Sequence, residues 1–379
     1  MDTATVTLHT AHNNGSFLQA YALQNTIKKM GFNNKLINFV PKAQYALYQN
    51  IIFKEISVKG IIKGSLNIPH YKELVERKGK FNRVINDLDL TEKIEDEILF
   101  PQIVREFDCI IAGSDQIWNN ATMPDFSDIY LLPVEKYKIS YAPSFGKSLE
   151  NQFGSNILEK INDFNHLSVR EKSVKRKLAH LLPDKKVEVV LDPTFLLDSS
   201  QYIELKENAN CTFDGDFIFF YCIKATTDVL KTVKEIGELL NLPIVTVFTG
   251  VTSYKCQLFG QKVDFSAGPE EFLKYIENAK YVISNSFHGI VFSIIYKKIF
   301  FRVGDNDHGS IRIDERLDSI LNLLGLTNQN IIAGESISLN KSIDYDEADE
   351  FLEQLKCKSL QWLEYSLKDA QKNLNYLKD

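Results

Sequence analysis

A histidine stands where an apolar strand gives way to an apolar helix, in the segment SNSFHG at residues 284–289. Unpaired backbone N–H groups and the helix dipole favour an anion at such a helix start. The side chains of Ser284, Ser286 and His288 add further donors. The segment therefore predicts a cradle for a phosphate or a carboxylate. The alternative is a helix capped by Ser286 beside a histidine of the core.

Two other apolar strands end in side chains that suit acid–base chemistry or anion binding. In FDCIIAGSDQIWNN, Asp115 can act as a general base or anchor a substrate, or it can only cap a short helix over residues 116–118. In HLSVREKS, Arg170 offers a planar guanidinium that suits a carboxylate or a phosphate. The alternative is a salt bridge from Arg170 to Glu171 or to a helix end.

A fourth junction lies near the start of the chain, in HTAHNNGSFLQAYALQ at residues 9–24. Ser16 followed by Gln19 matches a capping box, which predicts a helix that begins at Ser16 and ends before Gly31. Residues 13–15 then form a turn whose backbone approaches a ligand at the carboxyl ends of the strands. The alternative is a tight turn that only joins two elements, and this reading is favoured for His9 and His12.

Strands and helices that alternate along most of the chain must position these junctions. This alternation predicts an α/β fold with parallel sheets. Polar residues at 198–216 separate two sets of strands, so we expect an N-terminal domain over 1–205 and a C-terminal domain over 206–343. A last helix over 344–379 is expected to pack back across both. The expected strands are ATVTLH, KLINFV, FDCIIAG, KISYAP, HLSVRE, VEVVLDP, GDFIFFYCIK, LPIVTVF, KYVISNS and KIFFRV.

Composition excludes several classes of protein. The 379 residues include 44% hydrophobic and 25% charged residues, which is ordinary for a globular chain. A net charge of −6 argues against a general nucleic-acid binder. Five scattered cysteines favour neither disulfides nor zinc, and no metal-binding spacing occurs, so we expect a metal-independent protein. No signal peptide or membrane-spanning run is found, which predicts a cytoplasmic location.

A basic helical insertion departs from the alternating pattern, at about residues 51–100. Within 51–86, lysines and arginines outnumber glutamates and are interleaved with isoleucines. Charge runs are usually solvated, so a surface helix is the simpler interpretation. The alternative is a peripheral contact with an anionic membrane surface at the inner face of the cell membrane.

Taken in order, the junctions resemble the polysaccharide pyruvyltransferase family. The resembling segments are NNGSFLQAYAL, GSDQIWN, SVREKS, VLDPTFLL and SNSFHG, which span about residues 5–325. The resemblance implies two Rossmann-like domains that face each other across a cleft, as in GT-B glycosyltransferases. It also implies transfer of a pyruvyl group from phosphoenolpyruvate to a sugar of a bacterial capsule, exopolysaccharide or precursor. The product would be a cyclic ketal on two hydroxyls, formed with no cofactor.

The resemblance assigns roles to individual residues. His288 would be the acid or the phosphate contact, Arg170 would hold the donor, and Asp115 is the candidate base. The remaining donor-side candidates are Ser284, Ser286, Gly289, His308, Arg312 and Arg316. The acceptor-side candidates are Asn13, Asn14, Gly15, Ser114, Gln116 and Trp118.

One position departs from the family pattern, and two other functions stay open. Ser286 stands where some relatives carry an arginine, so Arg302, Arg312 or Arg316 must supply that charge if it is supplied at all. A nucleotide-sugar-dependent glycosyltransferase would use the same helix-start cradle for a diphosphate. A carbohydrate-binding member of a polysaccharide assembly complex would need no catalysis. The acceptor would be a glycan, either free or linked to a lipid.

Overall fold

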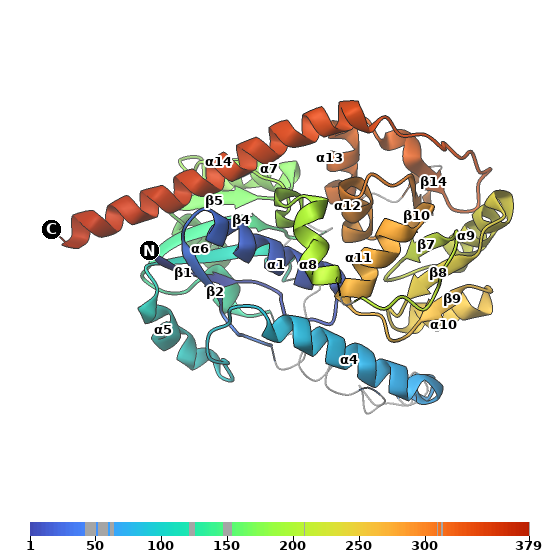
Figure 1. Ribbon diagram of the computed structural model, residues 1–379. Helices are drawn as coiled ribbons and strands as arrows, with labels where there is room; N and C mark the ends of the chain where they lie inside the picture. The colour runs from blue at the N-terminus through green and yellow to red at the C-terminus, as the bar shows by residue number, and fades with distance from the viewer. Residues whose placement is uncertain are drawn as a thin grey trace.

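Two six-stranded parallel sheets lie side by side, and helices surround them (Figure 1). The computed structural model describes residues 1–41, 51, 60, 64–120, 126–146, 154–207, 209–308, 310–311 and 314–378. Among these residues, no helix combines the length and the apolar character needed to cross a membrane. The predicted α/β fold with parallel sheets is confirmed.

The first sheet has the strand order β2-β1-β3-β4-β5-β6. The order reverses between β1 and β3, and such a switch point is where open α/β sheets bind ligands. The strands are β1 (Asp2–Val6), β2 (Asn33–Leu36), β3 (Cys109–Asp115), β4 (Tyr137–Pro143), β5 (His166–Val169) and β6 (Val187–Val189). The helices among them are α1 (Asn14–Lys29), α4 (Tyr71–Asn86), α5 (Phe100–Ile103), α6 (Ser155–Asn162) and α7 (Lys172–Leu181).

The second sheet has the order β14-β11-β10-β7-β8-β9, with its switch point between β10 and β7. Its strands are β7 (Ile218–Tyr221), β8 (Ile244–Val247), β9 (Lys262–Asp264), β10 (Tyr281–Ser284), β11 (Phe300–Gly304) and β14 (Asn330–Ile332). Its helices are α8 (Ile203–Lys206), α9 (Thr227–Leu240), α10 (Val251–Leu258), α11 (Pro269–Asn278), α12 (Phe287–Ile295) and α13 (Glu315–Leu323). A small antiparallel pair follows β11, formed by β12 (Asn306–Asp307) and β13 (Ser310–Ile311).

Short 3-10 turns connect several of these elements. They cover Ile68–His70, Glu97–Leu99, Val104–Glu106, Asp128–Leu131, Pro193–Leu196, Ser199–Tyr202 and Thr327–Gln329.

One apolar core joins the two halves of the molecule. It contains Phe17 of α1, Phe81 of α4, Phe272 of α11 and Phe292 of α12. Helix α1 contacts both α11 and α12. Because large aromatic side chains from both halves are buried here, the contact between the halves is stabilised as a hydrophobic core is. The carboxyl ends of the two sheets are thereby held close together.

The C-terminal helix α14 (Tyr345–Lys378) runs along both halves, as predicted (Figure 1). Ala348 near its start belongs to the shared core, whereas Leu363 and Leu367 pack with the helix α1 and the first sheet. The Asp369 carboxylate accepts hydrogen bonds from Tyr137 and His166 of the first sheet. The division at 205 and 343 itself stays a prediction, although the first sheet ends at residue 189 and the second begins at 218.

Two local predictions were wrong. Helix α1 begins at Asn14, because the Asn13 side chain accepts hydrogen bonds from the backbone N–H groups of Gly15 and Ser16 and caps the helix instead of Ser16. Residues 116–118 form a turn and no helix. Strands β9 and β14 were not predicted, since three residues give too short an apolar pattern.

Candidate active site

The two switch points open onto one cavity of about 420 Å³. The turn between β1 and α1 and the end of β3 form one wall. The end of β10 and the start of α12 form the other. Its described lining consists of Leu8, Asn13, Ser16, Asp115, Gln116, Ile223, Lys224, Asn285, Ser286, Phe287, His288, Asp314 and Arg316.

Asp115 is positioned at the last residue of β3 with a left-handed backbone, at φ 65°. Left-handed backbone is uncommon for non-glycine residues and is concentrated at functional sites. One carboxylate oxygen accepts a hydrogen bond of 2.7 Å from the Ser16 hydroxyl, and the other accepts one of 2.9 Å from the Gln116 N–H. These two donors hold the carboxylate at the cavity wall.

His288 lies in the first turn of α12, and its ring packs directly on Gly15 of α1. A Cβ built on Gly15 would lie 2.0 Å from His288 Nδ1. Only glycine allows the helix α1 and the imidazole to approach this closely. The sequence segments NNG and SFHG therefore meet, one from each half of the molecule.

A buried charge pair supports His288 from behind. Arg170 Nη2 lies 2.6 Å from Asp192 Oδ2, and His288 Nε2 lies 3.8 Å from the same oxygen. Thr194 donates through its N–H and its hydroxyl to the other Asp192 oxygen. Burial by itself raises the pKa of Asp192, but Arg170 and His288 outweigh it and hold that pKa below its usual range. Asp192 is therefore an anion beside the imidazole.

Arg170 also donates a hydrogen bond of 2.7 Å to the Ser114 hydroxyl, next to Asp115 in the chain. It thus connects the supports of Asp115 and His288. It does not belong to the described lining of the candidate active site, so its predicted role as a direct donor contact stays a prediction. The adjacent Glu171 is buried, which raises its pKa to about 7 against the opposing effect of Arg170.

Arg316 brings a cation to the wall that contains Ser286. Its guanidinium forms two hydrogen bonds to Asp314, of 3.0 and 2.8 Å, and lies 5.5 Å from the centre of the Phe287 ring. Of the three arginines considered for the missing family charge, Arg302 is buried in an ion pair with Asp318, and Arg312 lies outside the described residues. Arg316 is the described arginine that reaches the cavity.

Several predicted site residues do not line this cavity. Trp118 is buried in the core and donates to the Tyr130 carbonyl at 2.9 Å, which contradicts a role in acceptor binding. Ser284 donates to the Tyr221 carbonyl and packs under Gly289, whose Cβ position would lie 2.2 Å from the Ser284 hydroxyl. His308 is exposed in the turn after β12. Ser114 is fully buried beneath Asp115.

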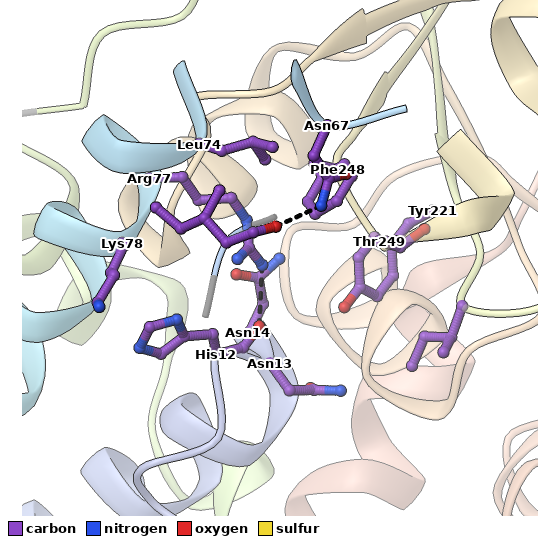
Figure 2. A pocket seen from close by; sticks show the side chains of 13 residues that line it. His12, Asn13, Asn14, Asn67, Leu74, Arg77, Lys78, Tyr221, Phe248 and Thr249 are labelled. Atoms are coloured by element: carbon purple, nitrogen blue, oxygen red, sulfur yellow. Dashed lines mark hydrogen bonds between the residues drawn. The ribbon is translucent and has the colours of Figure 1, made fainter. Parts of the chain in front are cut away.

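Asn14 belongs to a smaller adjoining pocket of about 200 Å³. Figure 2 shows Arg77 and Lys78 of α4 on one side of this pocket, Asn14 and His12 below them, and Phe248 and Thr249 on the far side. Arg77 donates to the His12 carbonyl at 2.8 Å. The adjoining pocket continues the first cavity, since Asn13 lines both.

The basic helix α4 uses several of its cations within the protein. Lys80 forms an ion pair of 2.9 Å with Glu271, and Arg83 pairs with Glu270. Lys59 and Lys63 lie outside the described residues. Contact of segment 51–86 with a membrane stays a prediction.

Sequence reasoning missed Lys224, Asn285 and Asp192. Lys224 follows β7 and Asn285 follows β10, so their position after strands beside the switch point was the available signal. Asp192 lies in VLDPTFLL, which carried the resemblance without a role for its carboxylate. Among the described residues, no group of three or more metal-ligating side chains is found.

Comparison with known families identifies the chain. A family model described as "Polysaccharide pyruvyl transferase" matches residues 13–307. That match covers the end of β3, the start of α1, the end of β10 and the start of α12, whereas β1 and α13 lie outside it. A comparison with curated protein sequences found no match.

Solved structures share the architecture at low sequence identity. UDP-GlcNAc 2-epimerase from Methanocaldococcus jannaschii is 11% identical, with 93% of this chain and 92% of that chain covered and a TM-score of 0.54. The enzyme from Rickettsia bellii is 11% identical, with 98% and 97% covered and a TM-score of 0.51. These likenesses concern the fold alone, and they confirm the predicted GT-B-like arrangement.

Proposed function

Because the chain belongs to the polysaccharide pyruvyl transferase family, we propose that it transfers the pyruvyl group of phosphoenolpyruvate to a sugar of a surface polysaccharide or its precursor. The product is a cyclic ketal on two hydroxyls, and phosphate is released. One observation carries this proposal: Asp115 and His288, from the two switch points, line the same cavity with Arg316.

The donor is proposed to bind at the start of α12. Phosphoenolpyruvate carries a phosphate and a carboxylate, and both need cationic or N–H partners. Arg316 and Lys224 line this wall, and the first N–H groups of α12 have no partner within the helix. Some relatives carry an arginine at the position of Ser286, and we propose that Arg316 supplies this charge instead.

The proposed reaction needs one proton donor and one base. His288 donates a proton to the methylene carbon of the donor, and Asp192 stabilises the charged imidazole before transfer. Asp115 accepts the proton of the first sugar hydroxyl as its oxygen bonds to the electrophilic carbon. The oxygen of the second hydroxyl then bonds to the same carbon and gives its proton to His288, which is neutral after the first step. The carbon–oxygen bond to phosphate breaks with its electrons leaving on phosphate, and the proton held by Asp115 leaves with the phosphate. Arg170 is a positioning residue for both groups.

The acceptor is proposed to enter from the side of Asn13 and Gln116. The adjoining pocket, with Asn14 and Arg77, then offers room for a neighbouring unit of the glycan. A lipid-linked acceptor at the inner face of the cell membrane would give the basic segment 51–86 its proposed docking role.

The test incubates the protein with phosphoenolpyruvate and glycosides of galactose, glucose or N-acetylmannosamine. Turnover is measured as phosphate release and as the mass of the sugar product. We expect a ketal product from the wild-type protein. Loss of the acid in His288→Ala should slow it by roughly 10²–10⁴-fold. His180→Ala, which changes an exposed histidine of α7 outside the cavity, is the matched control and should be unaffected. Equal turnover by the two variants would remove His288 from the mechanism.

A second experiment, with a UDP-sugar, distinguishes a glycosyltransferase from the proposed pyruvyl transferase. Thermal stabilisation by a UDP-sugar, with none by phosphoenolpyruvate, would favour the glycosyltransferase instead.

A further inference from the structure

A second cavity, of about 590 Å³, lies where α7, α13 and α14 meet the end of β6. We call it the α7–α14 cavity. It includes Phe287 and Arg316, which also line the candidate active site. Arg170 and Asp192, which support His288, also belong to its lining, and the proposed transfer reaction makes no use of the other residues. Its volume lies in the range of small-molecule sites, which are mostly apolar with a few polar groups.

The interior of the α7–α14 cavity is apolar. Helix α13 contributes Ile320 and Leu323, α14 contributes Leu355, and the segment that follows β6 contributes Leu191 and Phe195. Removal of these apolar side chains from water favours a ligand with a hydrocarbon body.

The rim of the α7–α14 cavity is cationic. Lys172, Lys175 and Arg176 stand three and four residues apart and so share one face of α7, and Lys358 adds a cation from α14. Lys175 pairs with Glu188 at 3.2 Å. Within the described part of the chain, Lys172, Arg176 and Lys358 have no carboxylate within ion-pair distance. Long basic side chains of this kind cover apolar surface with their stems and keep their charges in water.

Charge and apolarity together define one class of ligand. The described lining carries six lysines and arginines but two carboxylates, Glu188 and Asp192. We infer that the α7–α14 cavity binds an anionic amphiphile, a molecule with a phosphate or carboxylate head and a single apolar chain. The chain lies among α13, α14 and Phe195, and the head lies at Lys172, Arg176 and Lys358. This inference does not depend on the proposed transfer reaction.

The test uses dodecyl phosphate and laurate as probes, titrated below their micelle concentrations by isothermal calorimetry. Dodecyltrimethylammonium has the same chain with the opposite charge, and inorganic phosphate has the head without the chain. We expect saturable binding of the two anionic amphiphiles, with affinity that falls as salt rises. Binding of the cationic amphiphile with equal affinity would overturn the assigned head site. If inorganic phosphate binds as tightly as dodecyl phosphate, the assigned site for the apolar chain is wrong.

Two variants locate the probe. Ala179 lies on the same face of α7 and is exposed at the cavity, so Ala179→Trp fills the space without disturbing the core. The triple change of Lys172, Arg176 and Lys358 to alanine removes the head partners and should weaken binding roughly tenfold or more. Lys177→Ala, on the same helix but outside the cavity, is the matched control.

Each outcome is decisive. Binding that is lost in Ala179→Trp and weakened in the triple variant, but kept in Lys177→Ala, establishes the site. Binding that survives both changes, or no binding by the wild-type protein, refutes it. Because calorimetry measures no turnover, failure here is distinguishable from failure of the proposed function.

Discussion

Replacing Gly15 by alanine tests whether the approach of α1 to His288 matters for catalysis. The added methyl carbon would lie 2.0 Å from Nδ1, 2.4 Å from Cγ and 2.8 Å from Cε1 of the His288 ring. An ordinary contact begins near 3.4 Å, so the ring or the helix must move by about 1.4 Å. A displacement of about 1 Å at a catalytic group can lower the rate by about 10²-fold.

The same change should be mild for stability. Alanine is favoured over glycine within a helix by about 1 kcal/mol, whereas overpacking costs about 1–3 kcal/mol. The net loss expected for Gly15→Ala is therefore about 0–2 kcal/mol. The protein should fold, and kcat should fall by about 10²-fold while the secondary structure is unchanged.

The assay is steady-state phosphate release with a melting curve for each variant. Gly79→Ala is the matched control, because Gly79 lies in α4 with no atom within 4 Å of its Cβ position. It should keep full activity and be equally or more stable. In the double variant Gly15→Ala with His288→Ala, the clash is gone, so stability should recover and activity should equal that of His288→Ala alone. Full activity of Gly15→Ala would refute the reasoning.

Three further changes test the supports of the site. Burial gives Glu171 a pKa of about 7 against 4.5 in the unfolded chain, so its ionisation lowers stability as pH rises through that interval. Glu171→Gln should therefore melt at a higher temperature than the wild type at pH 8 but not at pH 4. An equal shift at both pH values would contradict ionisation of Glu171 as the cause. Asp192→Asn leaves the buried Arg170 without its anion and should cost about 3–5 kcal/mol in urea unfolding, and a loss below about 1 kcal/mol would contradict the pairing. Trp118→Phe loses one buried hydrogen bond and should lower the free energy of unfolding by about 1–3 kcal/mol, with the KM for the acceptor unchanged. A raised KM with unchanged stability would instead support a role of Trp118 in acceptor binding.

The sequence predicted the regions that meet, because the carboxyl ends of parallel strands share one edge of a sheet. Asp115 and His288 were recognised by their positions after apolar strands, and both line one cavity. The alternating pattern also predicted the two sheets and the long last helix. These features depend on local periodicity, which a single sequence contains.

Pairings over long distances were not predictable. Ser16 has the type and spacing of a helix cap, but Asn13 takes that role and the Ser16 hydroxyl binds Asp115 instead. Arg170 matched an anion-binding arginine, yet its anion is the protein's own Asp192. Trp118 has an amphipathic side chain that suits a sugar, but its N–H finds the Tyr130 carbonyl in the core. Each outcome depends on a partner supplied by the fold.

The source of the methyl proton in the product tests the proposed function most directly. Transfer from phosphoenolpyruvate in D₂O should place one deuterium in the methyl group of the ketal, with one phosphate released for each ketal formed, because a protein acid protonates the methylene carbon before the sugar adds. A ketal methyl without deuterium, or phosphate released with no ketal, would contradict it.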